Sequence, residues 1–251
     1  MPDISYVKIN ILKLYDIKSN NKKYPLNFDF IVRDKKNKNL SSNGIYFITE
    51  KIVNKIVYIG VMLSKDLKSK NYVHTNRFNK HLETLTLRGS NVGIKAKINS
   101  WFSKCNKINH QLYSLKNNIP NKDTGTTSDL NRVSYANLNW DKFSNNNNLN
   151  EIISNHFNLH YFKVSYFDEI MTNVFNNQKS IKFNKKNFLN IIQTIEDNIS
   201  KKYKPFLYVL KKNKKYPYKN QDWRSKMFEI SEIKNIIRNL SSIELTKLKT
   251  N

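Results

Sequence analysis

The alternation of apolar and polar positions is clearest between residues 44 and 60. Two short, β-branched runs occur there, Ile45–Ile48 and Ile56–Ile59, with a polar segment between them. Such runs, joined by a polar turn, are typical of two antiparallel strands. A glycine opens the first run and another closes the second, where backbone turns or lies close to another group. We predict a hairpin that presents Tyr46 and Tyr58 on one sheet.

A helix is expected shortly after this hairpin. Thr75 or Asn76 can cap it, and Phe78, Leu82 and Leu85 recur with the spacing of one helical stripe. Apolar residues on one stripe dock a helix against a sheet. The pattern therefore predicts a helix packed on the hairpin.

Arg77 and His81 lie four residues apart on this helix and therefore project from the same face. A surface pair of this kind is common. Beside two tyrosines, the pair is also a candidate for a functional role.

Two further elements follow in the second half of the chain. The run Tyr161–Phe167 is aromatic and β-branched and predicts a third strand. The stretch Asn187–Tyr203 predicts a helix, because isoleucines recur along one stripe. Glu196 lies between Ile192 and Ile199 on the buried-facing edge of that stripe. A carboxylate there requires a metal or a cation, unless it reaches solvent.

These elements predict an α+β fold, a small three-stranded antiparallel sheet flanked by helices, with a largely helical and loop insertion. We expect an N-terminal extension over residues 1–40 and a central domain over 41–218. The central domain is interrupted by an insertion over 86–160, which is rich in polar loop residues. Residues 219–251 carry a basic amphipathic helix, for which packing, dimerisation and DNA contact are the alternatives.

Charge narrows the class of partner. Lysine and arginine total 44 against 19 acidic residues, a formal net charge of +25. This balance favours a polyanion, and we expect double-stranded DNA. Arg88, Gln111, Arg132 and Arg224 are candidates for DNA contacts. A solvated surface loop is the alternative for the first three.

Other function classes are less consistent with the sequence. The chain has no run of about 18 apolar residues and begins without a secretory signal pattern, so we expect a cytoplasmic protein and no membrane partner. Cys105 is the sole cysteine, which excludes a cysteine-rich zinc site. His156 and His160 are four residues apart, but a helix-cap or strand-edge role is favoured over a metal role.

The triplets Gly44-Ile45-Tyr46 and Tyr58-Ile59-Gly60 resemble those that give the GIY-YIG endonuclease family its name. The run Ile195–Leu210, with its glutamate, lysines, proline and aromatic residues, is similar to the end of that module in the bacterial nucleotide-excision-repair endonuclease. The similarity extends to Lys215–Tyr218. The Arg77 and His81 pair looks like that of the family's restriction enzymes. The resemblance covers about residues 44–83 and 161–218.

The resemblance implies a divalent-metal-dependent DNA endonuclease of the type II restriction class. Glu196 would hold Mg²⁺ or Mn²⁺ on the scissile phosphate, and Arg77 would neutralise developing charge. Tyr46 would take a proton from the attacking water while Tyr58 orients the water or the phosphate. His81 is an alternative base or relay. One such site cuts one strand, so double-strand cleavage implies a homodimer or two binding events.

The sequence departs from the family at Tyr208, where the family has an asparagine that helps to hold the site together. The distance from Tyr58 to Arg77 is also longer than in the repair enzyme. A homing nuclease, a repair nuclease and a catalytically degenerate, basic DNA-binding protein are therefore the alternatives.

Overall fold

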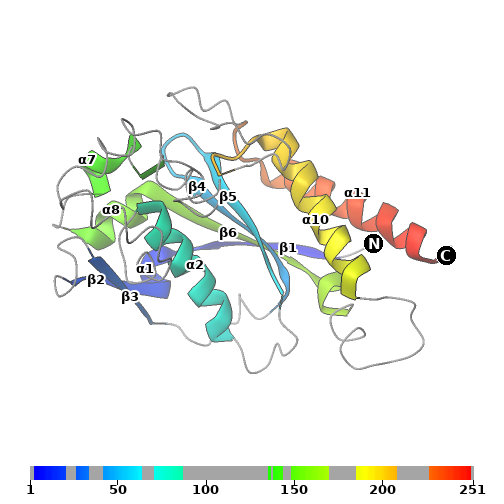
Figure 1. Cartoon of the computed structure of the whole chain (residues 1–251), viewed down its shortest axis with the longest axis horizontal. Coiled ribbons are helices and arrows are strands. Elements are labelled where there is room, and N and C mark those ends of the chain that lie inside the picture. Colours follow the sequence, from blue (N-terminus) through cyan, green and yellow to red (C-terminus); the bar gives the residue numbers. More distant parts are fainter. Residues whose placement is uncertain are drawn as a thin grey trace, which may run out of the picture.

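A four-stranded antiparallel sheet forms the centre of the computed structural model (Figure 1). The structure describes residues 3–20, 27–33, 42–63, 71–86, 135–136, 138–143, 148–169, 185–207 and 226–249. The strands are ordered β1-β6-β4-β5. Their bounds are β1 Ile4–Ile9, β4 Gly44–Glu50, β5 Lys55–Met62 and β6 Phe157–Val164.

The prediction of three strands was wrong by one. The N-terminal strand β1 joins the sheet by pairing along its whole length with β6, from Ile4 opposite Val164 to Ile9 opposite Leu159. Both isoleucines of β1 are buried. By pairing with β6, β1 makes it an interior strand and becomes the edge strand of the sheet itself.

The predicted hairpin is present as β4 and β5, joined by the turn Lys51–Asn54. Its register pairs Tyr46 with Gly60 and Ile48 with Tyr58, and then shifts between Ile48 and Thr49. This irregularity inserts one extra residue into β5. The third predicted strand is β6, which begins before Tyr161, at Phe157, inside the stretch assigned to the insertion.

Strand alternation gives the sheet two buried faces. Tyr46 and Ile48 of β4 pack into one apolar cluster, whereas Ile45 and Phe47 pack into the other. We call these the Tyr46 face and the Phe47 face. Each residue step along a strand reverses the side-chain direction, so two adjacent residues serve different cores.

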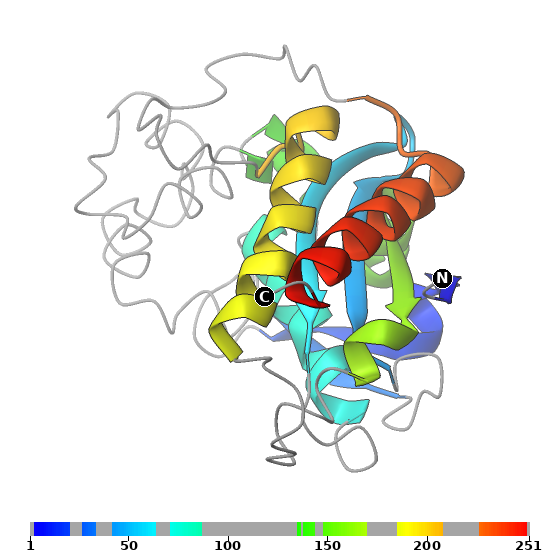
Figure 2. The same cartoon turned by 90° about the vertical axis from the view of Figure 1, so that its right-hand side faces the viewer.

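Different helices cover the two faces (Figure 2). The Tyr46 face packs against α1, α2, α7 and α8, and the Phe47 face against α10 and α11. Their bounds are α1 Ile11–Leu14, α2 Asn71–Thr86, α7 Trp140–Phe143, α8 Leu149–His156, α10 Lys185–Tyr203 and α11 Ile230–Lys249. Helix α2 starts at Asn71 rather than after a cap at Thr75 or Asn76.

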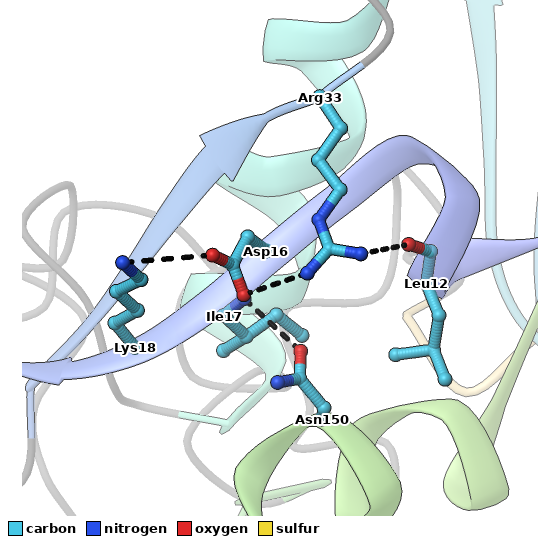
Figure 3. Close-up of polar contacts among 6 residues, drawn as sticks. All are labelled: Leu12, Asp16, Ile17, Lys18, Arg33 and Asn150. Atoms are coloured by element: carbon cyan, nitrogen blue, oxygen red, sulfur yellow. Dashed lines mark hydrogen bonds and ion pairs between the residues drawn. The ribbon is translucent and has the colours of Figure 1, made fainter.

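A second sheet, of β2 (Tyr15–Asn20) and β3 (Asn27–Val32), borders the Tyr46 face. Asp16 of β2 lies 3.1 Å from the Arg33 guanidinium and 3.7 Å from Lys18 (Figure 3). The backbone N–H of Ile17 donates to Asn150 Oδ1 of α8 at 3.0 Å. The ion pairs lie within the second sheet and the segment next to it, whereas the bond to Asn150 links the second sheet to α8.

Several predictions concern residues outside the described ranges: Arg88, Gln111, Arg132, Tyr208 and Arg224. The division into extension, insertion and C-terminal helix stays a prediction. Within the described part of the chain, no helix combines the length and the apolarity needed to cross a membrane.

His160 is a core residue rather than a strand-edge residue. It lies on the interior strand β6, and its ring nitrogens contact the Tyr6 hydroxyl at 2.8 Å and the Thr49 hydroxyl at 2.9 Å. Its ring also lies 4.2 Å from that of Phe228. The side chain therefore links three strands of the sheet. Burial, with a smaller effect from Lys8, lowers the pKa of His160 to about 3.

His156, at the end of α8, is buried on the Tyr46 face. Its Nε2 lies 2.8 Å from the Tyr135 hydroxyl, which lies 3.5 Å from a Glu50 carboxylate oxygen. Burial, and then Lys142, lower the pKa of His156 to about 3. Both histidines are thus satisfied by hydroxyl groups in the core.

The two buried histidines predict acid sensitivity. Their pKa values are about 3 when folded and about 6.5 when unfolded, so the unfolded chain binds more protons between these values. Each histidine therefore lowers the free energy of unfolding by up to about 1.4 kcal/mol per pH unit as pH falls through this window. Urea unfolding at pH 7, 5 and 4 measures the effect.

His160→Gln is the matched variant, because glutamine can replace both hydrogen bonds but does not titrate. We expect a shallower pH dependence than that of the parent protein. A free energy of unfolding that stays constant from pH 7 to 4 would contradict the assignment.

Candidate active site

Gly60 allows the Tyr46 ring to lie flat on the hairpin. The two residues are directly opposite each other in the β4–β5 ladder. A Cβ atom at position 60 would overlap the ring and hydroxyl of Tyr46. The Tyr58 ring lies on the same face, with its centroid 5.8 Å from that of Tyr46. Glycine at this position therefore sets where the Tyr46 hydroxyl points.

Helix α2 brings a histidine to these tyrosines. Its buried residues Phe78 and Leu82 pack on the Tyr46 face, as the apolar stripe predicted. This docking places His81 Nε2 2.6 Å from the Tyr46 hydroxyl. The His81 ring also lies 4.1 Å from that of Tyr58, at an angle of 33°. The structure thus joins three of the predicted site residues, which we call the Tyr–His cluster.

Phe78 holds the inner side of this cluster. Its ring meets Tyr46 edge to face, with centroids 5.1 Å apart and an interplanar angle of 78°. Edge-to-face packing is a favoured arrangement for aromatic pairs. Phe78 and His81 come from successive turns of α2, so one helix fixes the Tyr46 ring and binds its hydroxyl.

Exposure separates the roles that the three residues can take. Tyr46 is completely buried, whereas Tyr58 and His81 are only partly buried. A water molecule or a phosphate can reach Tyr58 and His81, whereas Tyr46 contacts His81 from the protein interior. The hydrogen bond fixes the imidazole orientation. If His81 Nε2 donates its hydrogen to Tyr46, Nδ1 carries the lone pair that can accept a proton.

Arg77 is exposed on α2, one turn before His81. Residues four apart lie on the same side of a helix. A guanidinium at this position is available to a phosphate that approaches the Tyr–His cluster. The structure therefore sets Arg77 beside the cluster, at the surface.

Glu196 lies on α10, which covers the opposite face of the sheet. It is partly buried and stands within the arc of the buried residues Ile192, Ile199 and Tyr203. The carboxylate is therefore not on the outward side of its helix, as the sequence indicated. Its helix packs on β5, the edge strand that carries Tyr58.

The chain crosses the β5 edge directly after α10. The N–H groups of Phe206 and Leu207 donate to the carbonyls of Ile56 and Val57, at 3.1 and 2.9 Å, and both side chains join the Tyr46 face. Helix α10 runs antiparallel to β5 (Figure 1). Glu196 precedes Tyr203 by seven residues, about 10 Å along the helix axis. That spacing places Glu196 about two helical turns before the end of α10.

A metal at this position would have to rely on few protein ligands. No group of three or more histidine, cysteine or acidic side chains that could hold a metal occurs among the described residues. Mg²⁺ commonly binds through one or two carboxylates, water and substrate phosphate. The oxygen ligand of Glu196 is compatible with such a site.

Glu83, a buried acid on α2, was not predicted from the sequence. It is 2% exposed and lowers the acidity of the buried Tyr15, whose pKa is raised chiefly by burial and further by this carboxylate. The signal was available, because Glu83 stands between the apolar residues Leu82 and Leu85. Its charge therefore acts on Tyr15, a residue of the second sheet.

The close approach at Gly60 predicts the effect of adding a single methyl group. In Gly60→Ala, the new Cβ must displace the Tyr46 ring and lengthen its hydrogen bond to His81. We expect a loss of about 1–3 kcal/mol in the free energy of unfolding, as for other overpacked cores. Urea denaturation measures the loss.

Tyr46→Phe combined with Gly60→Ala is the control for this variant, because it removes the hydroxyl but keeps the ring. The steric cost should persist in the double variant. If Gly60→Ala is as stable as the parent protein, the close packing is wrong.

Comparisons of the chain with protein-family models, curated proteins and solved structures find no match. The geometry of the Tyr–His cluster, the position of Glu196 and the charge of the chain are the observations from which its function is inferred.

Proposed function

We propose that the protein is a divalent-metal-dependent DNA endonuclease of the GIY-YIG type. The observation that carries the proposal is the contact of the Tyr46 hydroxyl with His81 Nε2 at 2.6 Å, with Tyr58 against the same imidazole. The family resemblance concerned the tyrosine triplets and the Arg–His spacing separately. Their meeting on one face of the sheet supports a common role.

The net charge of +25 supports a nucleic-acid substrate. Binding that depends on lysine contacts to phosphate releases counterions, so the affinity for DNA should fall steeply with salt. A restriction enzyme is the form of the proposal that we favour, with double-stranded DNA as its substrate. Cleavage of both strands then requires two copies of the site.

The proposed reaction is hydrolysis of a phosphodiester bond. The oxygen of water bonds to phosphorus as the bond to the leaving oxygen breaks. His81 accepts a proton of that water. The hydrogen bond with the buried Tyr46 hydroxyl holds the imidazole in its orientation. Tyr58 orients the water or the phosphate, and Arg77 balances charge on the phosphoryl oxygens. The leaving oxygen takes a proton from solvent.

Glu196 would hold the divalent ion, which supplies Lewis-acid stabilisation of charge on the phosphate when bound. For this role the carboxylate must reach around the edge strand β5, because α10 packs on β5 and Tyr58 lies on that strand. Its partly buried position on the helix that packs on β5 is compatible with that role.

Cleavage of plasmid DNA with Mg²⁺ tests the proposal. We expect discrete fragments from the parent protein and a loss of about a hundredfold or more in rate from Glu196→Ala or His81→Ala. Glu151→Ala is a matched control, because it removes an exposed acid on α8 and should retain the parent rate.

The pattern of products separates the alternatives. Nicking confined to lesions would indicate a repair nuclease, and cutting at one long asymmetric site a homing nuclease. An unchanged rate in Glu196→Ala would remove the proposed metal role. Binding of DNA without any cleavage would favour a degenerate nuclease that retains only its affinity for DNA.

A further inference from the structure

An exposed apolar surface lies at the turn end of the β4–β5 hairpin. Ile52 is 77% exposed and Val53 40%, and they meet solvent beside Met227 at 59% and Ile230 at 38%. Lys55 and Met227 form an isolated β-bridge, which brings the start of α11 to the turn. Two segments far apart in sequence thus contribute to one surface, which we call the hairpin tip.

The hairpin tip is held firmly on both sides. The N–H of Lys51 donates to the His156 carbonyl at 2.8 Å. On the other side, the N–H of Phe228 donates to the Asn54 carbonyl at 2.7 Å, and Asn54 Nδ2 donates to the Phe228 carbonyl at 3.1 Å. Asn54 has a φ of 49°, a left-handed conformation that asparagine tolerates. The turn therefore projects Ile52 from a fixed base.

Positive charge flanks these apolar side chains. Lys51, Lys55 and Lys226 adjoin the tip in sequence, and Lys51 and Lys226 are exposed. The acidic neighbours among the described residues are Glu50, which is partly buried and interacts with Lys55, Glu229, and Glu232, which interacts with Lys226. Apolar residues projecting between lysines suit a polyanion with an apolar interior. Duplex DNA has both features, since its phosphates surround stacked bases.

We propose that the hairpin tip is a DNA-contacting wedge, with Ile52 and Met227 entering the minor groove and the flanking lysines contacting phosphates. Proteins that bend DNA insert isoleucine and methionine between base steps in this way. This inference rests on the proposed function. It adds a point of contact outside the catalytic cluster.

The distance from the site suits a single duplex. The turn ends at Asn54, four residues before Tyr58, or about 13 Å along β5. A base pair rises about 3.4 Å, so the wedge would act about four base pairs from the phosphate at the Tyr–His cluster. Bending there would expose the scissile phosphate and favour flexible pyrimidine–purine steps.

The test uses the full chain with a mixed-sequence 30-base-pair duplex in EDTA, so that binding is measured without cleavage. The duplex carries 2-aminopurine at pyrimidine–purine steps, where fluorescence rises when a base unstacks. We expect the parent protein to raise the fluorescence. The double variant Ile52→Ser with Met227→Ser should lose that rise and bind about tenfold more weakly by anisotropy.

Two controls separate apolar insertion from charge. Ile31→Ser removes an isoleucine that is 48% exposed on β3, away from the tip, and should leave both signals unchanged. Lys51→Ala should reduce the slope of log affinity against log salt by about one while the fluorescence rise persists. The double variant Ile52→Ser with Met227→Ser and the control Ile31→Ser should keep the parent protein's slope of log affinity against log salt.

Affinity and fluorescence equal to the parent's in the Ser double variant would overturn the wedge. A parent dimer that becomes a monomer in that variant would also overturn it, because the surface would then bind a second copy. If the parent protein cleaves DNA and the Ser double variant matches it in affinity and fluorescence, only the wedge proposal is wrong. If the parent unstacks DNA but never cleaves it, the nuclease fails and the wedge stands.

Discussion

The hydrogen bond between the Tyr46 hydroxyl and His81 Nε2, 2.6 Å long, joins a strand of the central sheet to the helix that covers it. It depends on Gly60, which leaves space for the tyrosine ring, and on Phe78, which packs against the edge of that ring. A buried hydroxyl and a partly buried imidazole are thereby held as one unit. Tyr46 has no contact with solvent of its own, so the partly buried His81 is the exposed part of this unit.

The sheet edge at β5 organises the rest of the proposed site. Helix α2, with Arg77 and His81, covers one side of the sheet, and α10, with Glu196, covers the other. The chain crosses from one side to the other at Phe206 and Leu207, which bond to the start of β5. A substrate that used all of these groups would therefore lie along this edge. The hairpin tip stands at the turn where β5 begins, so catalytic groups and exposed apolar groups share one strand.

Local pattern was sufficient to predict the hairpin, the α2 stripe and the burial of the Glu196 side of α10, because each depends on residues close in sequence. It was insufficient for the fourth strand, since β1 finds its partner β6 about 150 residues later. The roles of His160 and His156 were missed for the same reason: their hydroxyl partners, Tyr6, Thr49 and Tyr135, come from distant segments. Spacing also placed Glu196 on the inner side of a helix but did not indicate which face of the sheet that helix covers.

The central claim is that Tyr46 and His81 act as one catalytic unit, and a double-mutant cycle on DNA cleavage tests it most directly. Rates are compared for the parent protein, Tyr46→Phe, His81→Ala and the double variant at saturating Mg²⁺, with equal folding checked by circular dichroism. Groups that act together give non-additive losses. The account predicts that the double variant is about as slow as His81→Ala alone. Rate losses that multiply in the double variant would contradict it, as would a cleavage rate in His81→Ala equal to that of the parent protein.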